Sequence, residues 1–447
     1  MKRKTLFIVA SLLAIMPCFS LASEPSITVL EDQFYYGGFM PQCLSANGKY
    51  VCGSSFSQVG FISEWQNRNN LVCNGRDGAP FASTFNYVTD EGRALSGSLV
   101  DFHTGKSERL GLGGFVDMMT EDGSIFVGMT PNKRISEFGS AHYIEYDACY
   151  WENGKLHVLP VPTEEELGYY YLRTRARCVS ADGSVILGEI IDRLYLLPMI
   201  IWRRQADGSY ELDAVCKDYF SDIKYNEGYY KDYVTFQGCA LSKNGKWVAM
   251  ILRPSPEYGK PATASLELAL YNVETGELTK ANIPDDFNIA PTPHYFIYYN
   301  GVSDDGTVVG YYENDFGGES AFIMHRDDMT PVNFIEEFHT IGQFADFDEY
   351  GLNRVSCITP DGRYICGYGW MDDYVGYVFD RGMTDAEYTD QKAEPPFSED
   401  ASVISIDTFE TGGETQYFDI SGRRSERPVK GVNIVRRPGF PPEKIVF

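Results

Sequence analysis

The sequence predicts an all-β protein, because short segments rich in β-branched and aromatic residues alternate with glycine-containing turns along most of its length. One turn pattern occurs seven times: an apolar residue, Ser or Thr, any residue, usually Asp or Asn, and then Gly. Ser, Thr, Asp and Asn side chains hydrogen-bond the backbone of tight turns, and Gly adopts the positive φ that other residues resist. Apolar runs flank each copy, which predicts a β-hairpin. The seven turn glycines are Gly48, Gly92, Gly123, Gly183, Gly245, Gly306 and Gly362.

A second hairpin follows most of these turns. It consists of an aromatic-bearing strand, a turn that usually contains Gly, and a strand that often ends in Leu or Val, as in 148–159 and 200–212. Each repeat therefore supplies four antiparallel strands. The turn glycines are 31 to 62 residues apart, which fits propeller blades of about 40 to 50 residues with added loops. We predict a seven-bladed β-propeller of four-stranded blades, and a linear β-solenoid is the alternative.

The last repeat contains three recognisable strands and lacks a clear fourth. The segment Ser26–Leu30 precedes the first repeat and has the composition of a strand. We therefore expect Ser26–Leu30 to complete the last blade and to close the ring. Trp151, Trp202 and Trp247 fall on predicted strands, where we expect them to pack between blades.

The chain divides into four predicted regions. A charged start, a short apolar stretch and small residues at its end make residues 1–22 a predicted signal peptide, with a lipoprotein signal at Cys18 as the alternative. The propeller is predicted over 23–383, an acidic linker containing two prolines over 384–400, and a small β-sandwich-like module over 401–447. No other segment is long and apolar enough to predict a membrane span.

The C-terminal module resembles the sorting domain of type IX secretion substrates. The resemblance rests on Tyr-x-Asp-x-x-Gly-Arg over 417–423, Gly-x-x-Ile-Val over 431–435 and the terminal Lys-Ile-Val over 444–446. Asn433 stands where an aromatic residue is usual, and the segment 437–442 replaces a simple turn. The resemblance implies contact with the secretion machinery and a location outside the cell or on the outer-membrane surface of a Gram-negative bacterium.

The repeats over about 40–380 resemble two propeller families. The Ser-x-Asp-Gly core followed by an aromatic strand is similar to the HAF-type extracellular repeat, and Ile358–Arg363 is similar to the repeats of Tol-type periplasmic propellers. Both resemblances imply binding or structural modules, and neither supplies a set of catalytic residues that could be transferred to this chain.

Charge and cysteine content exclude some functions and leave others open. Without residues 1–22, 35 Lys and Arg stand against 63 Asp and Glu, which excludes nucleic acid as a partner because such binding requires a positive surface. Nine cysteines remain. Several occupy equivalent repeat positions and are interpreted as small core residues. Disulfides across a hairpin, between Cys43 and Cys52 or between Cys357 and Cys366, are the alternative in an oxidising compartment.

Most of the extra chain length falls on one predicted face of the propeller. These connections join the second strand of a blade to the third, or one blade to the next, and they are rich in Tyr. Tyr combines a flat apolar ring with a polar tip and suits contact surfaces, although each ring can instead pack under its own loop. The predicted ligand-binding residues are Tyr169, Tyr170, Tyr229, Tyr230, Tyr298, Tyr299, Trp370 and Tyr374.

Catalytic motifs are absent from the sequence. The six histidines lack metal-binding spacing, and no nucleophile elbow or phosphate-binding glycine loop is present. We expect no metal and no cofactor, with a structural calcium ion as the one possibility left open. The predicted function is recognition of a glycan or a surface protein, rather than catalysis. The alternatives are a polysaccharide hydrolase or lyase on a propeller scaffold, and a structural or adhesive surface protein.

Overall fold

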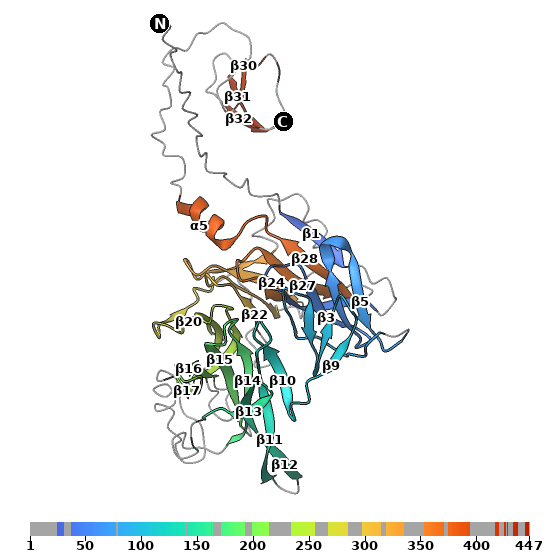
Figure 1. Ribbon diagram of the computed structural model, residues 1–447. Helices are drawn as coiled ribbons and strands as arrows, with labels where there is room; N and C mark the ends of the chain where they lie inside the picture. Colours follow the sequence, from blue (N-terminus) through green and yellow to red (C-terminus); the bar gives the residue numbers. More distant parts are fainter. Residues whose placement is uncertain are drawn as a thin grey trace, which may run out of the picture. The chain divides into compact units, whose positions relative to one another are not determined.

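The computed structural model of the chain divides into two compact units, Met1–Tyr388 and Thr389–Phe447 (Figure 1). Its regular structure is almost entirely β. The residues that the structure describes are 25–30, 37–76, 79–138, 141–161, 163, 171–192, 199–213, 234–254, 267–284, 297–313, 319–334, 353–370, 374–393, 416–419, 424–425, 427, 432–436 and 443–446.

The larger unit is a succession of antiparallel sets of four strands, in which each strand pairs with the next along the chain. The first set is β2 (Phe39–Leu44), β3 (Val51–Ser55), β4 (Gly60–Glu64) and β5 (Asn69–Cys73), with the short 3-10 helix η1 (Trp65–Asn67) after β4. The second set is β6 (Tyr87–Val88), β7 (Arg93–Leu95), β8 (Ser98–Asp101) and β9 (Ser107–Arg109). Its strands are short, in keeping with the 31 residues between Gly92 and Gly123.

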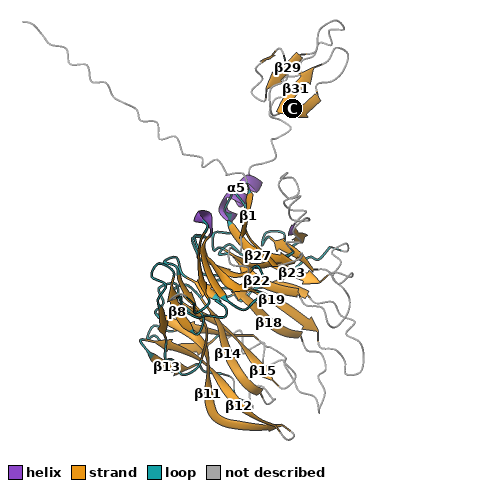
Figure 2. Ribbon diagram, turned by 90° about the vertical axis from the view of Figure 1, so that its right-hand side faces the viewer, coloured by secondary structure: helices purple, strands orange, loops and turns teal. Residues whose placement is uncertain are grey.

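The third and fourth sets join into one eight-stranded sheet. The third set is β10 (Phe115–Met119), β11 (Ile125–Phe138), β12 (Ala141–Glu152) and β13 (Lys155–Val158). The fourth set is β14 (Tyr171–Val179), β15 (Val185–Asp192), β16 (Met199–Arg204) and β17 (Tyr210–Leu212). A single parallel pairing of Tyr146 with Arg173 joins them. The long hairpin of β11 and β12 extends beyond the neighbouring strands (Figures 1 and 2).

The remaining strands of this unit complete three further sets. The fifth set is β18 (Val234–Leu241), β19 (Trp247–Pro254), β20 (Glu267–Asn272) and β21 (Leu278–Lys280). The sixth set is β22 (Ile297–Val302), β23 (Val308–Glu313), β24 (Glu319–Met324) and β25 (Pro331–Asn333). The last set is β26 (Arg354–Ile358), β27 (Tyr364–Trp370), β28 (Tyr374–Asp380) and, from the other end of the chain, β1 (Ser26–Leu30).

The pairing of β1 with β28 confirms the predicted closure by Ser26–Leu30. The two strands are antiparallel, with Ser26 opposite Asp380 and Leu30 opposite Gly376. The inner strand β2 of the first set also contacts β26 and β27 of the last set. In Figure 1 the blue strands of the first set accordingly lie beside the orange strands of the last.

Apolar side chains fill the spaces between successive sets. One core cluster contains Tyr50 and Val88 of the first two sets and extends to Met119 of the third. Other clusters join the third, fourth and fifth sets, the fifth and sixth, the sixth and last, and the last and first. The sets therefore follow one another in a closed circuit of antiparallel meanders, which is the architecture of a β-propeller.

Two of the predicted tryptophans are core residues. Trp151 and Trp202 are fully buried, and their indole N–H groups donate to the carbonyl oxygens of Leu112 and Pro160 at 2.8 and 2.5 Å. Trp247 is half-buried instead, and the guanidinium of Arg326 in the next set lies 5.6 Å from its ring.

The repeated turns have the predicted chemistry. In the third copy Thr120 Oγ1 donates to Asp122 Oδ1 at 2.6 Å, and the backbone N–H of Ser124 donates to the same oxygen at 2.9 Å. The copy at Gly306 is one residue shorter and departs from this pattern. Its Ser303 Oγ donates at 2.5 Å to Asp385, a residue 82 positions along the chain.

The first half of the predicted linker over 384–400 contains a helix, α5 (Asp385–Ala393). Thr384 and Glu387 form a capping box at its start. The N–H of Thr384 donates to Glu387 Oε2 at 2.8 Å, and the N–H of Glu387 donates to Thr384 Oγ1 at 3.3 Å. Asp385 is buried and accepts a hydrogen bond from Arg381 at 2.7 Å. This segment is therefore anchored to the larger unit as far as Tyr388.

The smaller unit contains one antiparallel sheet. Its strand order is β30 (Arg424–Ser425), β29 (Gln416–Asp419), β31 (Val432–Arg436) and β32 (Glu443–Val446). The predicted strand at 403–406 lies outside the described residues. Throughout the described part of both units, no helix has the length and apolar character needed to cross a bilayer.

Candidate functional site

The strands of the larger unit end on two faces with different chemistry. We call one the turn face; it carries the repeated turns at 45–48, 89–92, 120–123, 180–183, 242–245, 303–306 and 359–362. We call the other the loop face; its described residues include 56–59, 74–76, 79–86 and 110–114, together with Trp370 and Tyr374 at the facing ends of β27 and β28.

Hydrogen bonds connect neighbouring turns across the turn face. Backbone N–H groups of one turn donate to an acidic side chain or a carbonyl of the next. The donor and acceptor pairs are Asn47 to Asp90 (2.8 Å), Asp90 to Glu121 (2.6 Å), Glu121 to Ala181 (3.4 Å), Ala181 to Lys243 (2.7 Å), Asn244 to Asp304 (2.8 Å) and Asp304 to Pro360 (2.8 Å). Each turn thus fixes the position of the next, and the turn face has little freedom to open.

One contact on the turn face joins sets that are not neighbours along the circuit. Lys243 Nζ, from the fifth set, lies 2.5 Å from the hydroxyl oxygen of Tyr87 in the second set and 3.7 Å from the centre of its ring. The Tyr87 hydroxyl donates to Glu121 Oε2 at 2.6 Å, and burial raises the pKa of this phenol. These side chains brace the inner strands at the turn face, so they are structural groups rather than candidates for ligand binding.

The loop face instead carries a cluster of aromatic rings from the first and last sets. The ring of Tyr374 lies 5.2 Å from that of Phe56 and 5.8 Å from that of Tyr368. Phe56 is 56% exposed, and both tyrosines are half-buried. The exposed ring of Phe56 therefore contacts Tyr374, which in turn contacts Tyr368.

Arg354 at the start of β26 holds this cluster against the sixth set. Its guanidinium forms a bidentate ion pair with Glu319 and donates to the hydroxyl of Tyr368 at 3.0 Å. The same group lies 5.3 Å from the ring of Tyr311 and 5.4 Å from that of Tyr368. The hydrogen bond with Glu319 raises the pKa of Arg354, so the cation is permanent. A fixed cation packed among rings is a common component of recognition surfaces.

A second aromatic group lies on the loop face at the third set. Phe115, 55% exposed, contacts the ring of Tyr146 edge-on at 5.7 Å. Next to Phe115 on the inner strand, Asp117 pairs with Arg175 of the fourth set through an Nε–Oδ2 contact of 2.7 Å. This group thus repeats the combination of an exposed ring with a fixed ion pair.

Exposed apolar side chains are concentrated on this face. Among the described residues, six large hydrophobic side chains are exposed, and four of them, Phe56, Phe81, Phe115 and Ile144, lie at the loop face. The other two, Leu156 and Val158, lie on the outer strand β13. Phe56 and Phe81 belong to the first set and the connection after it, and Phe115 and Ile144 to the third set.

The predicted ligand-binding residues are only partly described. Tyr169, Tyr170, Tyr229 and Tyr230 lie outside the described residues. Tyr298 and Tyr299 lie on β22, and Trp370 ends β27 directly opposite Tyr374. Tyr374 alone among the eight has a described side chain, and it belongs to the aromatic cluster.

Sequence reasoning missed Phe56, Tyr368, Arg354 and Glu319. Phe56 and Trp370 both stand three positions after the Gly that closes a repeat, so a shared repeat position was the available signal for Phe56. Arg354 and Glu319 gave no signal, because their partnership joins two sets that are separate in the sequence.

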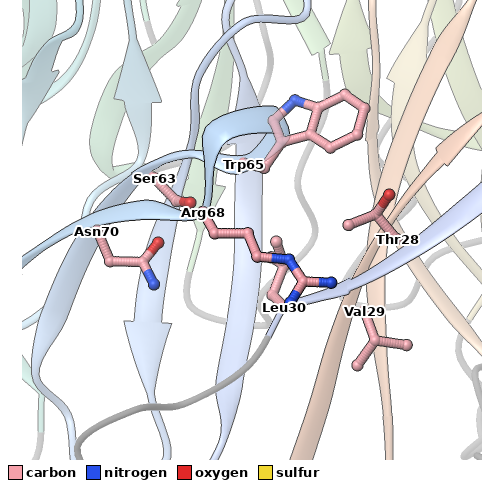
Figure 3. A pocket seen from close by; sticks show the side chains of 7 residues that line it. All are labelled: Thr28, Val29, Leu30, Ser63, Trp65, Arg68 and Asn70. Carbon is pink, nitrogen blue, oxygen red and sulfur yellow. The ribbon is translucent and has the colours of Figure 1, made fainter.

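A small pocket lies between β1 and the first set (Figure 3). It has about 290 Å³ of empty space, part of it open to solvent, and Thr28, Leu30, Trp65 and Arg68 are among its lining residues. The Trp65 indole is fixed by donation to the carbonyl of Gly48 at 2.6 Å. No three His, Cys, Asp or Glu side chains within the described ranges are arranged to hold a metal ion.

Comparison with known proteins gives distant likenesses. No family model matches the chain, and no curated protein matches it. Among solved structures it is similar to TolB from Acinetobacter baumannii, with 13% identity, 66% of this chain and 53% of that chain covered, and a TM-score of 0.33. It is also similar to the β-propeller domain of the Trilobed protease from Pyrococcus furiosus (14% identity, 64% and 78% covered, TM-score 0.36). A third similar structure is prolyl oligopeptidase B from Galerina marginata, with 11% identity, 89% of this chain and 46% of that chain covered, and a TM-score of 0.38. The chain thus spans about half the length of the TolB structure, and likeness at this level carries no functional information.

Proposed function

We propose that this chain is an exported binding module that recognises a protein or a glycan through the loop face of a seven-bladed β-propeller. The observation that carries the proposal is the concentration of exposed Phe56, Phe81, Phe115 and Ile144 on that face. The turn face offers no comparable surface, since hydrogen bonds between its polar turns occupy it. A ligand that needs apolar and aromatic contacts would therefore bind at the loop face.

The seven blades of this proposal correspond to the strand sets described above. Each set contributes one blade, and the last blade takes its outermost strand from β1. The merged third and fourth sets count as two blades in this scheme, because each has its own repeated turn and its own meander of four strands.

Binding is better supported than catalysis by the carboxylates of the loop face. Asp117 and Glu319 are each engaged by an arginine from a neighbouring set. A glycosidase needs one carboxyl group able to donate a proton and a second able to attack or to activate water. Both carboxylates are instead held in ion pairs within the protein.

The exposed side chains favour a protein partner over a glycan. Phe and Ile carry no polar group to accompany the hydroxyls of a sugar, whereas aromatic residues and Arg are enriched at protein interfaces. The glycan alternative rests on Tyr374 and Tyr368, whose rings lie beside the fixed guanidinium of Arg354.

Export is proposed from the predicted signal peptide over 1–22 and the sorting-domain resemblance of 401–447. The partners implied are the secretion machinery and a target at the cell surface. Cell fractionation of the full chain and of a form lacking 401–447 tests this part. Retention of the shortened form in the periplasm is expected, and equal surface display of both forms would contradict it.

Matched surface variants test the binding role. The mature chain is compared with a loop-face variant carrying Phe56→Ser and Phe115→Ser, and with a control carrying Leu156→Ser and Val158→Ser on β13. The readouts are binding to outer-membrane preparations, before and after protease treatment, and binding to a glycan array. We expect a loss of about tenfold or more for the loop-face variant alone, as for removal of central contact residues. Equal binding by both variants would exclude the loop face. Binding that survives protease treatment of the membranes, together with binding to a glycan on the array, would favour the glycan alternative.

A further inference from the structure

Four cysteines meet where the first set packs on the last. Cys43 on β2 lies directly opposite Cys52 on β3, and Cys357 on β26 lies directly opposite Cys366 on β27. The two pairs occupy the same positions in two copies of the repeat. Because β2 contacts β26 and β27, closure of the circuit brings both pairs to one interface.

The packing of these side chains makes them one cluster. Cys43 and Cys52 belong to a core cluster against which Cys357 packs, and Cys357 also packs against the cluster that contains Cys366. A hydrogen bond with the Cys357 thiol, together with burial, raises the pKa of the Cys43 thiol well above its ordinary value. Cys357 therefore lies between the two halves of the interface and contacts Cys43 across it.

We propose that Cys43 and Cys357 form a disulfide that covalently joins the first set to the last. The two residues sit on the innermost strands of adjacent sets. Each hairpin pair lies within one set, whereas Cys357 packs against the core clusters of both sets and is placed to link them.

Thiol–disulfide exchange with a small disulfide such as oxidised glutathione supplies the oxidising equivalents. The Cys357 thiolate attacks one sulfur of the oxidant, whose S–S bond breaks, and one glutathione leaves as a thiolate and takes up a proton. The Cys43 thiolate then attacks the Cys357 sulfur of this mixed disulfide, and the second glutathione leaves. Two protein thiols lose two electrons, and the oxidant gains them as two thiols.

The timing of the reaction follows from the state of these thiols in the folded chain. A hydrogen bond with Cys366 raises the pKa of Cys357 to about 12, and the thiolate is the reacting form. Oxidation is therefore slow once the circuit has closed, and it takes place while the chain folds. The bond would close the circuit at the inner strands, whereas the β1–β28 pairing closes it at the outer strands.

Peptide mapping of the refolded chain tests the pairing. The mature chain is unfolded and reduced, then refolded with a mixture of oxidised and reduced glutathione or with dithiothreitol, and free thiols are alkylated before digestion. We expect one linked peptide, joining Cys43 to Cys357, in the oxidised sample. The thermal midpoint of this sample should be about 5 to 10 °C above that of the reduced one, because the bond closes a very long loop.

Two single variants separate this bond from general effects of oxidation. Cys43→Ala should abolish the linked peptide and the difference between oxidised and reduced midpoints. Cys178→Ala should keep both, since Cys178 occupies the same repeat position in the fourth set and packs against a different core cluster. A map of the unmutated chain that links Cys43 to Cys52, links Cys357 to Cys366, or shows all four residues alkylated overturns the proposal, whether or not the variants fold.

Discussion

The turn face and the loop face are built from opposite ends of the same strands, yet they are held together differently. On the turn face one residue pattern recurs, and backbone N–H groups of one turn donate to side-chain or carbonyl oxygens of the next. On the loop face the connections differ in length and sequence, and side chains such as Arg354 and Tyr374 make the contacts between sets.

This difference assigns stability and recognition to separate faces. The turns satisfy buried backbone groups and cannot vary without cost, because an unpaired buried N–H or C=O is destabilising. The loop face lies outside that network, so its exposed rings are available for a partner. Substitutions at the turn face should therefore lower the free energy of unfolding, and those at the loop face should change binding.

The largest expected effect is at the anchor of α5 on the turn face. Asp385 and Arg381 form a buried ion pair, and Asp385 also accepts a hydrogen bond from the hydroxyl of Ser303. Asp385→Ala leaves the Arg381 cation buried without its carboxylate, and we expect a loss of about 3 to 5 kcal/mol in the free energy of unfolding. Equilibrium denaturation in guanidinium chloride measures it.

The matched control for this anchor is Asp327→Ala, which removes the partner of Arg326 in an exposed ion pair. Its cost should stay below about 1 kcal/mol. Replacing both Arg381 and Asp385 by Met and Leu should restore much of the loss, because no charge is then buried alone. Equal effects of Asp385→Ala and Asp327→Ala would mean that α5 is not anchored.

The second effect compares two turn glycines with the same backbone conformation. Gly48 and Gly154 have φ values of +71° and +72°. A Cβ at Gly48 would lie 2.2 Å from the ring of Tyr364 in the last set, whereas nothing lies within 4 Å of one at Gly154. We expect Gly154→Ala to lower the free energy of unfolding by about 1 to 2 kcal/mol, because alanine is strained in the left-handed conformation. Gly48→Ala should cost about 1 to 3 kcal/mol more. Thermal and chemical denaturation of both variants would show whether the faces of neighbouring sets are packed this closely.

The sequence predicted those parts of the fold that depend on local chemistry. A turn such as that at Asp122 is specified by adjacent residues, and closure by Ser26–Leu30 followed from counting strands. Buried Trp151 and Trp202 followed from apolar strands. The start of α5 was also specified locally, by the Thr384–Glu387 capping box, but the acidic composition of the segment outweighed that signal.

The rest depended on contacts between distant residues. Ser303 bonds to Asp385, and nothing in the shortened turn at Gly306 indicates that a residue from α5 takes the acceptor position. The loop-face cluster combines Phe56 with Tyr374 and Arg354, which come from opposite ends of the chain. The tyrosine-rich connections drew attention to Tyr374, but a linear pattern cannot show which side chains converge there.

A smaller effect is expected in the pH dependence of the turn face. The hydrogen bond from Thr120 lowers the pKa of Asp122. Because the folded pKa lies below the unfolded value of about 3.9, the ionised side chain stabilises the fold above that pH. The stabilisation is lost as the pH falls through the folded pKa. Asp122→Asn should remove this contribution, a few tenths to about 1 kcal/mol at pH 7, since the side chain is exposed.

Unfolding free energies measured between pH 7 and pH 2 test this contribution. They should show a shallower acid loss for Asp122→Asn than for the unmutated chain. Identical profiles for the two proteins would argue against a stabilising role for the carboxylate of Asp122.

The smallest effect on stability should come from the loop face, and the two ends of β10 allow the comparison within one strand. Phe115 lies at the loop-face end and is 55% exposed, whereas Met119 lies at the turn-face end and is 1% exposed. Phe115→Ser should change the free energy of unfolding by no more than about 0.5 kcal/mol. Met119→Ala should cost about 2 to 5 kcal/mol, since it opens a cavity in the core. If Phe115→Ser proved as destabilising as Met119→Ala, the Phe115 ring would serve the fold, and the division of labour between the two faces would not hold.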